Sequence, residues 1–99
     1  MRIILGKSSC DYLIHRQGSG DTWEIFDLAV KSERGVGIGR SMVEQLLSEL
    51  PNDVTLVYAI TRKSNRIAQE FYKALGFRLI GVLTRFYGDE DAAMYGVDR

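Results

Sequence analysis

The sequence predicts one α/β (α+β) domain, residues 1–99, in which a mixed sheet carries two helices. Three observations predict this fold class. Two segments with apolar side chains at helical spacing flank a short, near-continuous apolar run, as in a βαβ unit. One pair of strand-like segments precedes this unit and another follows it, and each pair is joined by a polar, glycine-containing turn. We therefore expect the order β-β-β-α-β-α-β-β, with antiparallel strands on both flanks, in two or three layers.

The first third of the chain predicts three strands. Residues 1–5 suit a short edge strand. Residues 12–16 and 22–30 read as the next two strands, and the segment QGSGD between them suits a hairpin turn.

The central region predicts a helix followed by a buried strand. From residue 38 the apolar period becomes helical, and Pro51-Asn52 ends the run; its apolar members are Ile38, Met42, Val43, Leu46, Leu47 and Leu50. Residues 54–60 are almost continuously apolar, as expected of a strand buried on both faces of a parallel sheet.

The last third predicts a second helix and a closing hairpin. Ser64 or Asn65 can cap this helix and Gly76 can end it. Its apolar stripe consists of Ile67, Ala68, Phe71, Tyr72 and Leu75. Residues 77–87 and 92–97 suit two strands around the turn GDED.

Composition excludes several classes of function. The net charge is zero, which argues against a nucleic-acid partner, and no segment approaches the ~18 apolar residues of a membrane span. One cysteine and one histidine exclude an internal disulfide and make a metal site unexpected. We expect a soluble, cytoplasmic protein without metal, nucleic-acid or membrane partners.

The glycine-rich segment GVGIG, residues 35–39, lies between the third strand and the first helix, with an arginine on either side. Helix N-termini present unpaired N–H groups that suit phosphate, and glycine lets the backbone approach an anion closely. The segment therefore suggests a pyrophosphate site, with a flexible strand–helix turn as the alternative. It lacks the lysine of a Walker loop, and its spacing does not fit the dinucleotide fingerprint G-x-G-x-x-G.

The same segment resembles a family signature. Residues 34–39, RGVGIG, match the [R/Q]-x-x-G-x-[G/A] motif of the GNAT superfamily of acyl-CoA-dependent N-acyltransferases. Residues 64–77, SNRIAQEFYKALGF, resemble that family's N-x-x-A-x-x-F-Y-x-x-x-G-F helix, and residues 84–97 resemble the closing hairpin of its branch that acetylates protein N-termini. The resemblance covers residue 22 to the C-terminus.

The resemblance implies a site for acetyl-CoA as cosubstrate. The loop would hold the coenzyme A pyrophosphate through Arg34, Gly35, Val36, Gly37, Ile38, Gly39 and Arg40. The backbone of Leu28, Ala29 and Val30 would pair with the pantetheine arm as an added strand, which requires the strands at 23–30 and 54–60 to splay apart. A backbone N–H near Val30 would stabilise the oxyanion.

Two side chains of the second motif would complete the site. Asn65 would contact the coenzyme arm, and Tyr72 would direct its hydroxyl at the thioester sulfur. From the sequence alone, Asn65 can instead be a helix cap and Tyr72 a core aromatic.

Glu24 is the candidate catalytic base, because it occupies the position of the catalytic glutamate in the histone-acetylating branch that the sequence resembles. On a regular strand Glu24, Phe26, Leu28 and Val30 share one face, while Asp27 faces the opposite way. An exposed strand glutamate is the alternative. The branch that acetylates protein N-termini has its glutamate at the position of Ile60 in this chain. His15 is a further candidate for the base, although a lone histidine on a strand is more often a structural or exposed residue.

Family members usually begin with a strand and two helices that wall the acceptor site, whereas about twenty residues precede Trp23 here. We expect an unusually open acceptor cleft, or a second subunit that completes it as a homodimer. The expected function is N-acetyltransfer from acetyl-CoA to a primary amine of a small molecule or protein by direct attack. The alternatives are a non-catalytic coenzyme A-binding or protein-interaction module, and a nucleotide-phosphate binder.

Overall fold

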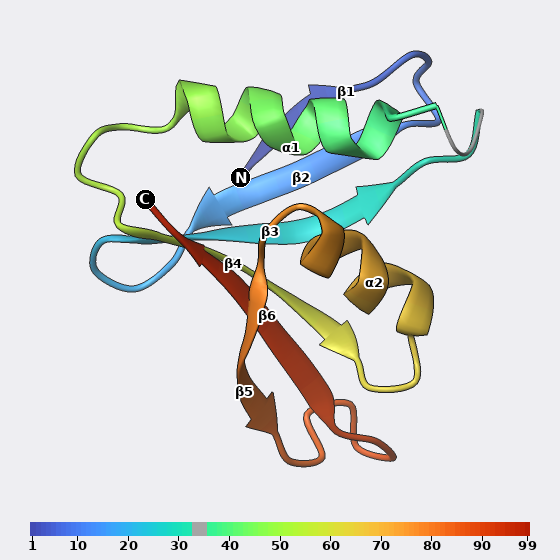
Figure 1. Cartoon of the computed structure of the whole chain (residues 1–99), viewed down its shortest axis with the longest axis vertical. Coiled ribbons are helices and arrows are strands. Elements are labelled where there is room, and N and C mark those ends of the chain that lie inside the picture. The colour runs from blue at the N-terminus through green and yellow to red at the C-terminus, as the bar shows by residue number, and fades with distance from the viewer. Residues whose placement is uncertain (33–35) are drawn as a thin grey trace.

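The computed structural model describes residues 1–32 and 36–99. Six strands and two helices follow one another in the predicted order (Figure 1). Their bounds are β1 Arg2–Leu5, β2 Tyr12–Gln17, β3 Thr22–Ala29, α1 Ile38–Glu49, β4 Leu56–Arg62, α2 Arg66–Ala74, β5 Arg78–Leu83 and β6 Ala92–Asp98. The mixed α/β fold class is confirmed. Neither described helix is long and apolar enough to cross a membrane.

All six strands form one sheet in the order β1-β2-β3-β4-β6-β5. Only β3 and β4 pair in parallel, and the other neighbours are antiparallel. The closing strand β6 therefore lies inside the sheet, and β5 forms its edge. β5 ends at Leu83, four residues before the predicted end, because the chain turns at Arg85, which has a φ of 52° and accepts a hydrogen bond from the Gly88 N–H.

Both helices lie on one face of the sheet, so the fold has two layers (Figure 1). α1 contacts β1 and β2, and α2 contacts β6, where the Tyr95 hydroxyl donates to Gln69 Oε1 at 3.2 Å. No helix within residues 1–32 and 36–99 covers the opposite face. The prediction that the β4 segment is buried on both faces is therefore wrong: Val57 and Ala59 are buried beneath the helices, while Tyr58 is only partly buried.

The two helices contribute unequally to the core. The apolar stripe of α1 is largely buried against Leu13, Ile25 and Val57 of the sheet; its buried members are Met42, Val43 and Leu46. In α2 only Tyr72 is buried, and Ile67 is 75% exposed. The other members of the predicted stripe, Ala68, Phe71 and Leu75, are partly buried and pack against the edge of the core.

β3 carries the irregularity that shapes the centre of the fold. Opposite β2, Ile25 pairs with His15 and Asp27 pairs with Ile14, so Phe26 is the extra residue of a β-bulge. The ladder between β3 and β4 runs from Thr22 to Ile25 and no further, although both strands continue. The predicted splay of these two strands is confirmed, and it begins at the bulge.

The bulge also changes which side chains of β3 share a face. Residues directly opposite one another in an antiparallel pair project to the same side. Glu24 lies opposite Arg16, Asp27 lies opposite Ile14, and Leu28 lies opposite Leu13. Asp27 is therefore on the face of Glu24, and Leu28 is on the other. The prediction from regular alternation was wrong here, because one inserted residue shifts the period.

Candidate functional site

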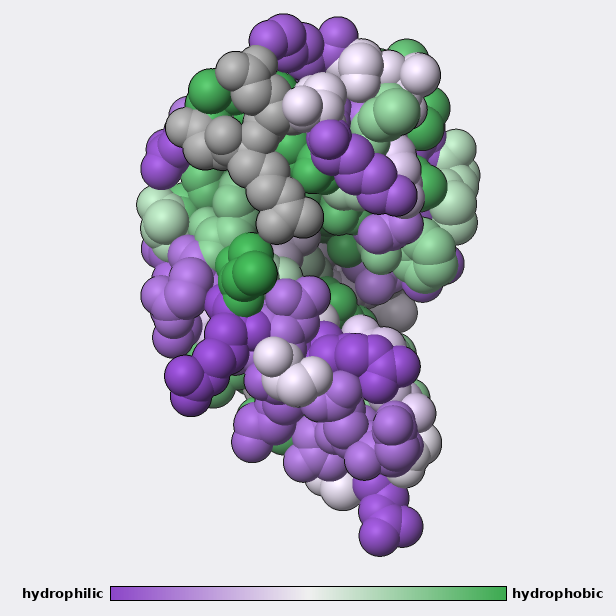
Figure 2. All heavy atoms as spheres, turned by 90° about the vertical axis from the view of Figure 1, so that its right-hand side faces the viewer, coloured by the Kyte–Doolittle hydropathy of each residue, from purple (hydrophilic) through white to green (hydrophobic). Residues whose placement is uncertain are grey.

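A groove opens where β3 and β4 part, between the start of α1 and one side of α2. Its cavity volume is about 640 Å³, within the range of small-molecule sites. Figure 2 looks onto this side of the molecule, where apolar side chains gather in the upper half and hydrophilic ones cover the lower half. The lining residues are Leu28, Ala29, Val30 and Lys31 after the bulge, Gly37, Ile38, Gly39 and Arg40 of α1, and Asn65, Ile67, Ala68, Phe71, Ala74 and Leu75 of α2.

The start of α1 meets the requirements of an anion site. Its N-cap residue, Gly37, has a φ of 82°, and no side chain within the described part of the chain caps the helix. The first helical hydrogen bond runs from the Ser41 N–H to the Gly37 carbonyl, so the preceding N–H groups have no partner inside the helix. The first turn carries no acidic residue. These features fit a pyrophosphate at this end of the groove.

Gly37 and Gly39, the glycines of this loop that the structure describes, are required for different structural reasons. A side chain on Gly37 would meet nothing within 4 Å, so its glycine is required by the left-handed backbone alone. A Cβ on Gly39 would lie 2.9 Å from Cε1 of Phe71, so its glycine is required by the close packing of α1 against α2. Predicted contacts of Arg34 and Gly35 lie outside the described residues.

Arg40 borders the groove with its guanidinium tied to α2. Its Nη2 donates to the Ala74 carbonyl at 3.2 Å, and its Nη1 lies 3.8 Å from a carboxylate oxygen of Glu44. Val36 is exposed and Ile38 is half-buried. A direct contact of these side chains with phosphate remains a prediction.

The strand side of the groove has free backbone. Leu28, Ala29 and Val30 all line it. Because the ladder with β4 stops at Ile25, the β4-facing edge of residues 28 and 29 has no strand partner among the described residues. An extended ligand could add to this edge as a short strand, as the sequence predicted.

Asn65 lies at the start of α2 and caps it. Its Oδ1 accepts from the Ala68 N–H at 3.1 Å, which confirms the helix-cap interpretation. The same residue lines the groove, where the coenzyme arm is predicted to lie. The contact itself stays a prediction.

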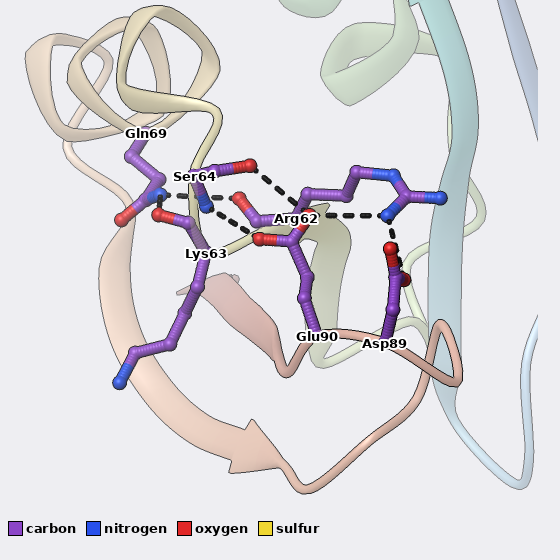
Figure 3. A network of polar contacts seen from close by, with 6 residues as sticks. All are labelled: Arg62, Lys63, Ser64, Gln69, Asp89 and Glu90. Carbon is purple, nitrogen blue, oxygen red and sulfur yellow. Dashed lines mark hydrogen bonds and ion pairs between the residues drawn. The ribbon is translucent and has the colours of Figure 1, made fainter.

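A polar network holds the segment that leads into Asn65 (Figure 3). Glu90 accepts hydrogen bonds from Arg62 Nη1 at 3.0 Å and from the N–H and hydroxyl of Ser64 at 3.1 and 3.0 Å. Gln69 Nε2 donates to the carbonyls of Lys63 at 2.8 Å and Arg62 at 3.2 Å. The bonds from Arg62 and Ser64 lower the pKa of Glu90. The β5–β6 hairpin loop is thereby fastened to the start of α2.

Tyr72 lies in the core and does not line the groove. It is 5% exposed and packs between Phe71 and Phe77, with ring centroids 5.2 and 5.3 Å away. Burial, followed by the charge of Asp27, raises the pKa of Tyr72, so the hydroxyl keeps its proton near neutral pH. These contacts fit the core-aromatic interpretation, and the direction of its hydroxyl toward a thioester stays a prediction.

Glu24 is buried and forms an ion pair with Arg16. Only 8% of the residue is exposed, and Arg16 Nε lies 2.8 Å from its Oε1. The alternative of an exposed strand glutamate is therefore wrong. Arg16 also lies over the Phe26 ring, 4.0 Å from its centroid. Glu24 pairs with Tyr58 in the part of β3 that is still joined to β4, so it precedes the splayed segment.

Asp27 lies two residues beyond the last pair of that ladder, in the splayed segment. Its Oδ2 accepts from the Tyr12 hydroxyl at 3.2 Å, and its negative charge contributes to the raised pKa of Tyr72. His15 is a structural residue: it is buried, and its Nδ1 accepts from the Trp23 indole N–H at 3.0 Å. Burial, and secondarily Arg2, lowers the pKa of His15.

Two residues that bear on the site were missed from the sequence. Lys31 lines the groove, and its charge beside the glycine-rich segment could have indicated it. Asp11 accepts hydrogen bonds from the backbone N–H groups of Lys31 and Ser32. These partners are about twenty residues away in sequence, and no local pattern indicates such a contact.

Comparison with known proteins agrees with this geometry. Residues 6–77 match the model of the acetyltransferase (GNAT) family, and the chain belongs to that family. It is 38% identical over 74 residues to an uncharacterized N-acetyltransferase of Methanocaldococcus jannaschii, an alignment that covers 71% of this chain and 47% of that protein. The chain thus spans about half the length of this curated relative.

Solved structures share the fold. A ribosomal-protein alanine N-acetyltransferase from Escherichia coli superposes with a TM-score of 0.74 at 27% identity, over 90% of this chain and 61% of that one. A GNAT family acetyltransferase from Elizabethkingia anophelis, solved with acetyl-CoA bound, superposes with a TM-score of 0.82 at 17% identity, over 91% of this chain and 69% of that one.

Proposed function

We propose that this chain transfers an acetyl group from acetyl-CoA to a primary amine by direct attack. The observation that carries the proposal is the groove, which joins an uncapped helix start to a strand edge without a partner. A pyrophosphate needs the first and an amide-containing arm needs the second. Membership of the acetyltransferase family supports the same ligand.

In the proposed complex, the first-turn N–H groups of α1 hold the pyrophosphate of the coenzyme. The backbone of Leu28 and Ala29 pairs with the pantetheine arm, and Ile67 and Phe71 cover it with apolar surface. This explains why the apolar stripe of α2 extends beyond the core to Ile67, which is exposed and lines the groove.

Two carboxylates compete for the role of base that removes a proton from the attacking amine. Glu24 has the position implied by the histone-acetylating branch, but its ion pair with Arg16 must loosen before it can accept a proton. Asp27 is exposed, shares the face of Glu24 and lies where the strands are already apart. A backbone N–H near Val30 stabilises the negative charge on the carbonyl oxygen. Tyr72 donates a proton to the departing thiolate, for which its hydroxyl must first turn from the core toward the groove.

The structure also favours a second candidate function, a coenzyme A-binding module without turnover. Tyr72 is packed between two phenylalanine rings and Glu24 is ion-paired, so neither is poised for proton transfer in the described geometry. Such a module would keep the whole groove and need none of these groups.

The acceptor is proposed as a primary amine of a small molecule or a protein, in the cytoplasm. The helix-free face of the sheet exposes Ile3, Leu5 and Phe26, which are 58%, 57% and 47% exposed. We propose that a second copy of the chain covers this face and closes the acceptor side. Sedimentation over a range of concentrations would test this, and a monomer at the highest concentration would contradict it.

Calorimetry with acetyl-CoA, coenzyme A, ATP and NAD tests the ligand. We expect the two coenzyme A forms to bind in the micromolar range or tighter and the nucleotides to bind more weakly; equal affinity for all four would contradict a coenzyme A site. A screen of amine acceptors with a thiol-detection assay then separates enzyme from module. With an acceptor in hand, Glu24→Gln and Asp27→Asn are compared across pH, since loss of the base is partly rescued when high pH deprotonates the amine.

A further inference from the structure

The turn between β1 and β2 contains a buried carboxylate that the site described above leaves unexplained. Asp11 is fully buried. Its Oδ1 accepts from the backbone N–H groups of Lys31 and Ser32, at 2.8 and 3.0 Å, and its Oδ2 accepts from the Ser32 hydroxyl. These two residues directly follow the strand-edge segment that lines the groove and begin the connection to α1.

The donors around Asp11 favour its ionised form. The hydrogen bonds from Ser32, first the hydroxyl and then the N–H, outweigh burial and lower its pKa to about 2. A buried carboxylate without hydrogen-bond donors would strongly destabilise the fold. The N–H groups of residues 31 and 32 therefore stay bonded to Asp11, and the position of Asp11 fixes theirs. Asp11 in turn is held by its own turn, since its N–H donates to the Ser8 carbonyl at 3.0 Å.

The same turn also touches the other end of the connection. The Gly6 N–H donates to the Asp11 carbonyl at 2.9 Å. A Cβ on Gly6 would lie 2.8 Å from Cβ of Asp11, 2.9 Å from Cγ2 of Ile38 and 3.3 Å from Sδ of Met42. The turn therefore packs directly on the first residues of α1. One short segment, residues 6–11, thus fixes both the exit from β3 and the entry into α1.

We infer that Asp11 is the positioning residue for the pyrophosphate-binding start of α1, an inference that rests on the proposed coenzyme site. Asp11 does not contact the ligand. It holds residues 31 and 32, while its turn holds Ile38, so the first-turn N–H groups are aimed before the ligand arrives. Pre-organised donors bind more tightly because less ordering takes place on binding.

A turn that merely stabilises the fold makes a different prediction from a turn that positions one subsite. If the turn only stabilises the fold, a variant should lose affinity for every ligand of the groove by the same factor. If the turn positions the start of α1, a variant should lose affinity for ligands that carry a pyrophosphate and keep its affinity for ligands that bind only along β3. Coenzyme A and ADP carry a pyrophosphate, and pantetheine does not, so the three ligands separate the two roles.

The test compares Asp11→Asn, Ser32→Ala and the control Asp21→Asn. Asp21 also ties a turn by a side-chain bond, accepting from the Thr55 hydroxyl at 2.6 Å, but at the β2–β3 hairpin, away from the groove. Affinity is measured by calorimetry for coenzyme A and by ligand-observed NMR for ADP and pantetheine, with thermal melting for each variant.

For Asp11→Asn we expect coenzyme A and ADP to bind about tenfold more weakly, as for loss of one charge-assisted hydrogen bond, with pantetheine unchanged. Ser32→Ala should show the same selectivity at about threefold, and Asp21→Asn should bind all three like the parent protein. If Asp11→Asn does not fold, Ser32→Ala decides, because its exposed side chain leaves no core cavity.

The role of Asp11 would be overturned if Asp11→Asn and Ser32→Ala both kept the coenzyme A affinity of the parent protein, or if they lost affinity for all three ligands by the same factor. If the parent protein itself binds no coenzyme A, the proposed function fails instead, which the parent titration shows before any variant is made.

Discussion

α1 and α2 begin at the same groove, but their first turns are completed in opposite ways. α2 is capped by its own sequence, because Asn65 accepts from the Ala68 N–H. α1 begins at Gly37, where no described side chain takes that role. A glycine at the N-cap costs a helix only a few tenths of a kcal/mol relative to a capping side chain, but it leaves the first N–H groups without a side-chain acceptor. The chain tolerates this at α1 only, at the end of the groove where a phosphate can supply the missing acceptor.

The two starts are also held in place differently. The start of α2 is fastened by side chains near it in space, the Glu90 and Gln69 network of Figure 3. The start of α1 is held by packing, from Gly6 on one side and Phe71 on the other. The comparison teaches that a helix start can be kept rigid while its N–H groups remain free.

The largest expected effect is on the free N–H groups of α1. Gly37→Asp places a carboxylate where the phosphate is proposed to bind, and aspartate tolerates the left-handed backbone better than most residues. We expect coenzyme A affinity to fall by at least about a hundredfold. Gly20→Asp is the matched control, since Gly20 also has a positive φ, 62°, and open space around it. Equal coenzyme A affinity of the two variants, measured by calorimetry, would contradict a phosphate site at the start of α1.

The next effect concerns the packing that holds α1. Gly39→Ala drives a methyl group into the Phe71 ring, which we expect to lower the free energy of unfolding by about 1–3 kcal/mol. Phe71→Leu removes the clashing ring edge, so the double variant should recover part of that loss in a double-mutant cycle of urea unfolding. Strict additivity would show that Gly39 is not required by this contact.

A smaller effect separates the two roles of Asn65. Asn65→Ala removes the cap and should destabilise the protein by about 1 kcal/mol, whereas Asn65→Asp keeps an acceptor for the Ala68 N–H and should not. If the amide nitrogen of Asn65 also contacts the coenzyme arm, Asn65→Asp weakens coenzyme A binding at unchanged stability. Urea unfolding and calorimetry on both variants check this, and parent-like binding by Asn65→Asp would leave Asn65 a cap alone.

Much of this site was predictable because its motifs are local. The start of α1 after Gly37 and the helix capped by Asn65 lie in short continuous segments, and each helix keeps its predicted place. The features that were not predictable depend on contacts distant in sequence. The bulge at Phe26 is defined only by pairing with β2, and β6 lies inside the sheet only because it pairs with β4. Asp11 meets its partners twenty residues away.

The direction of side chains was the least predictable feature. Tyr72 and Phe71 are neighbours on one apolar stripe, yet Tyr72 enters the core and Phe71 lines the groove. Periodicity identifies a stripe but not the boundary between core and ligand surface, because both are apolar.

The smallest effect is a difference in acid response between the two helix starts. Both are anchored by a carboxylate whose pKa is lowered: Glu90 by Arg62 and Ser64 at α2, and Asp11 by Ser32 at the connection to α1. A carboxyl group with a lowered pKa contributes its full stabilisation above its ordinary pKa and loses it as the pH falls through its pKa in the folded state. The lowering is larger for Asp11, to about 2 from 3.8.

On acidification from pH 5, we therefore expect the start of α2 to loosen before the connection to α1. The backbone amide signal of Ser64 should shift first in an NMR titration, and those of Lys31 and Ser32 should shift only as the pH approaches about 2. Glu90→Gln is the control, because it should abolish the early shift at Ser64 and leave the late one unchanged. Simultaneous shifts at all three amides would mean that acid unfolds the domain as a unit, and that the two helix starts, although completed differently, are not independent.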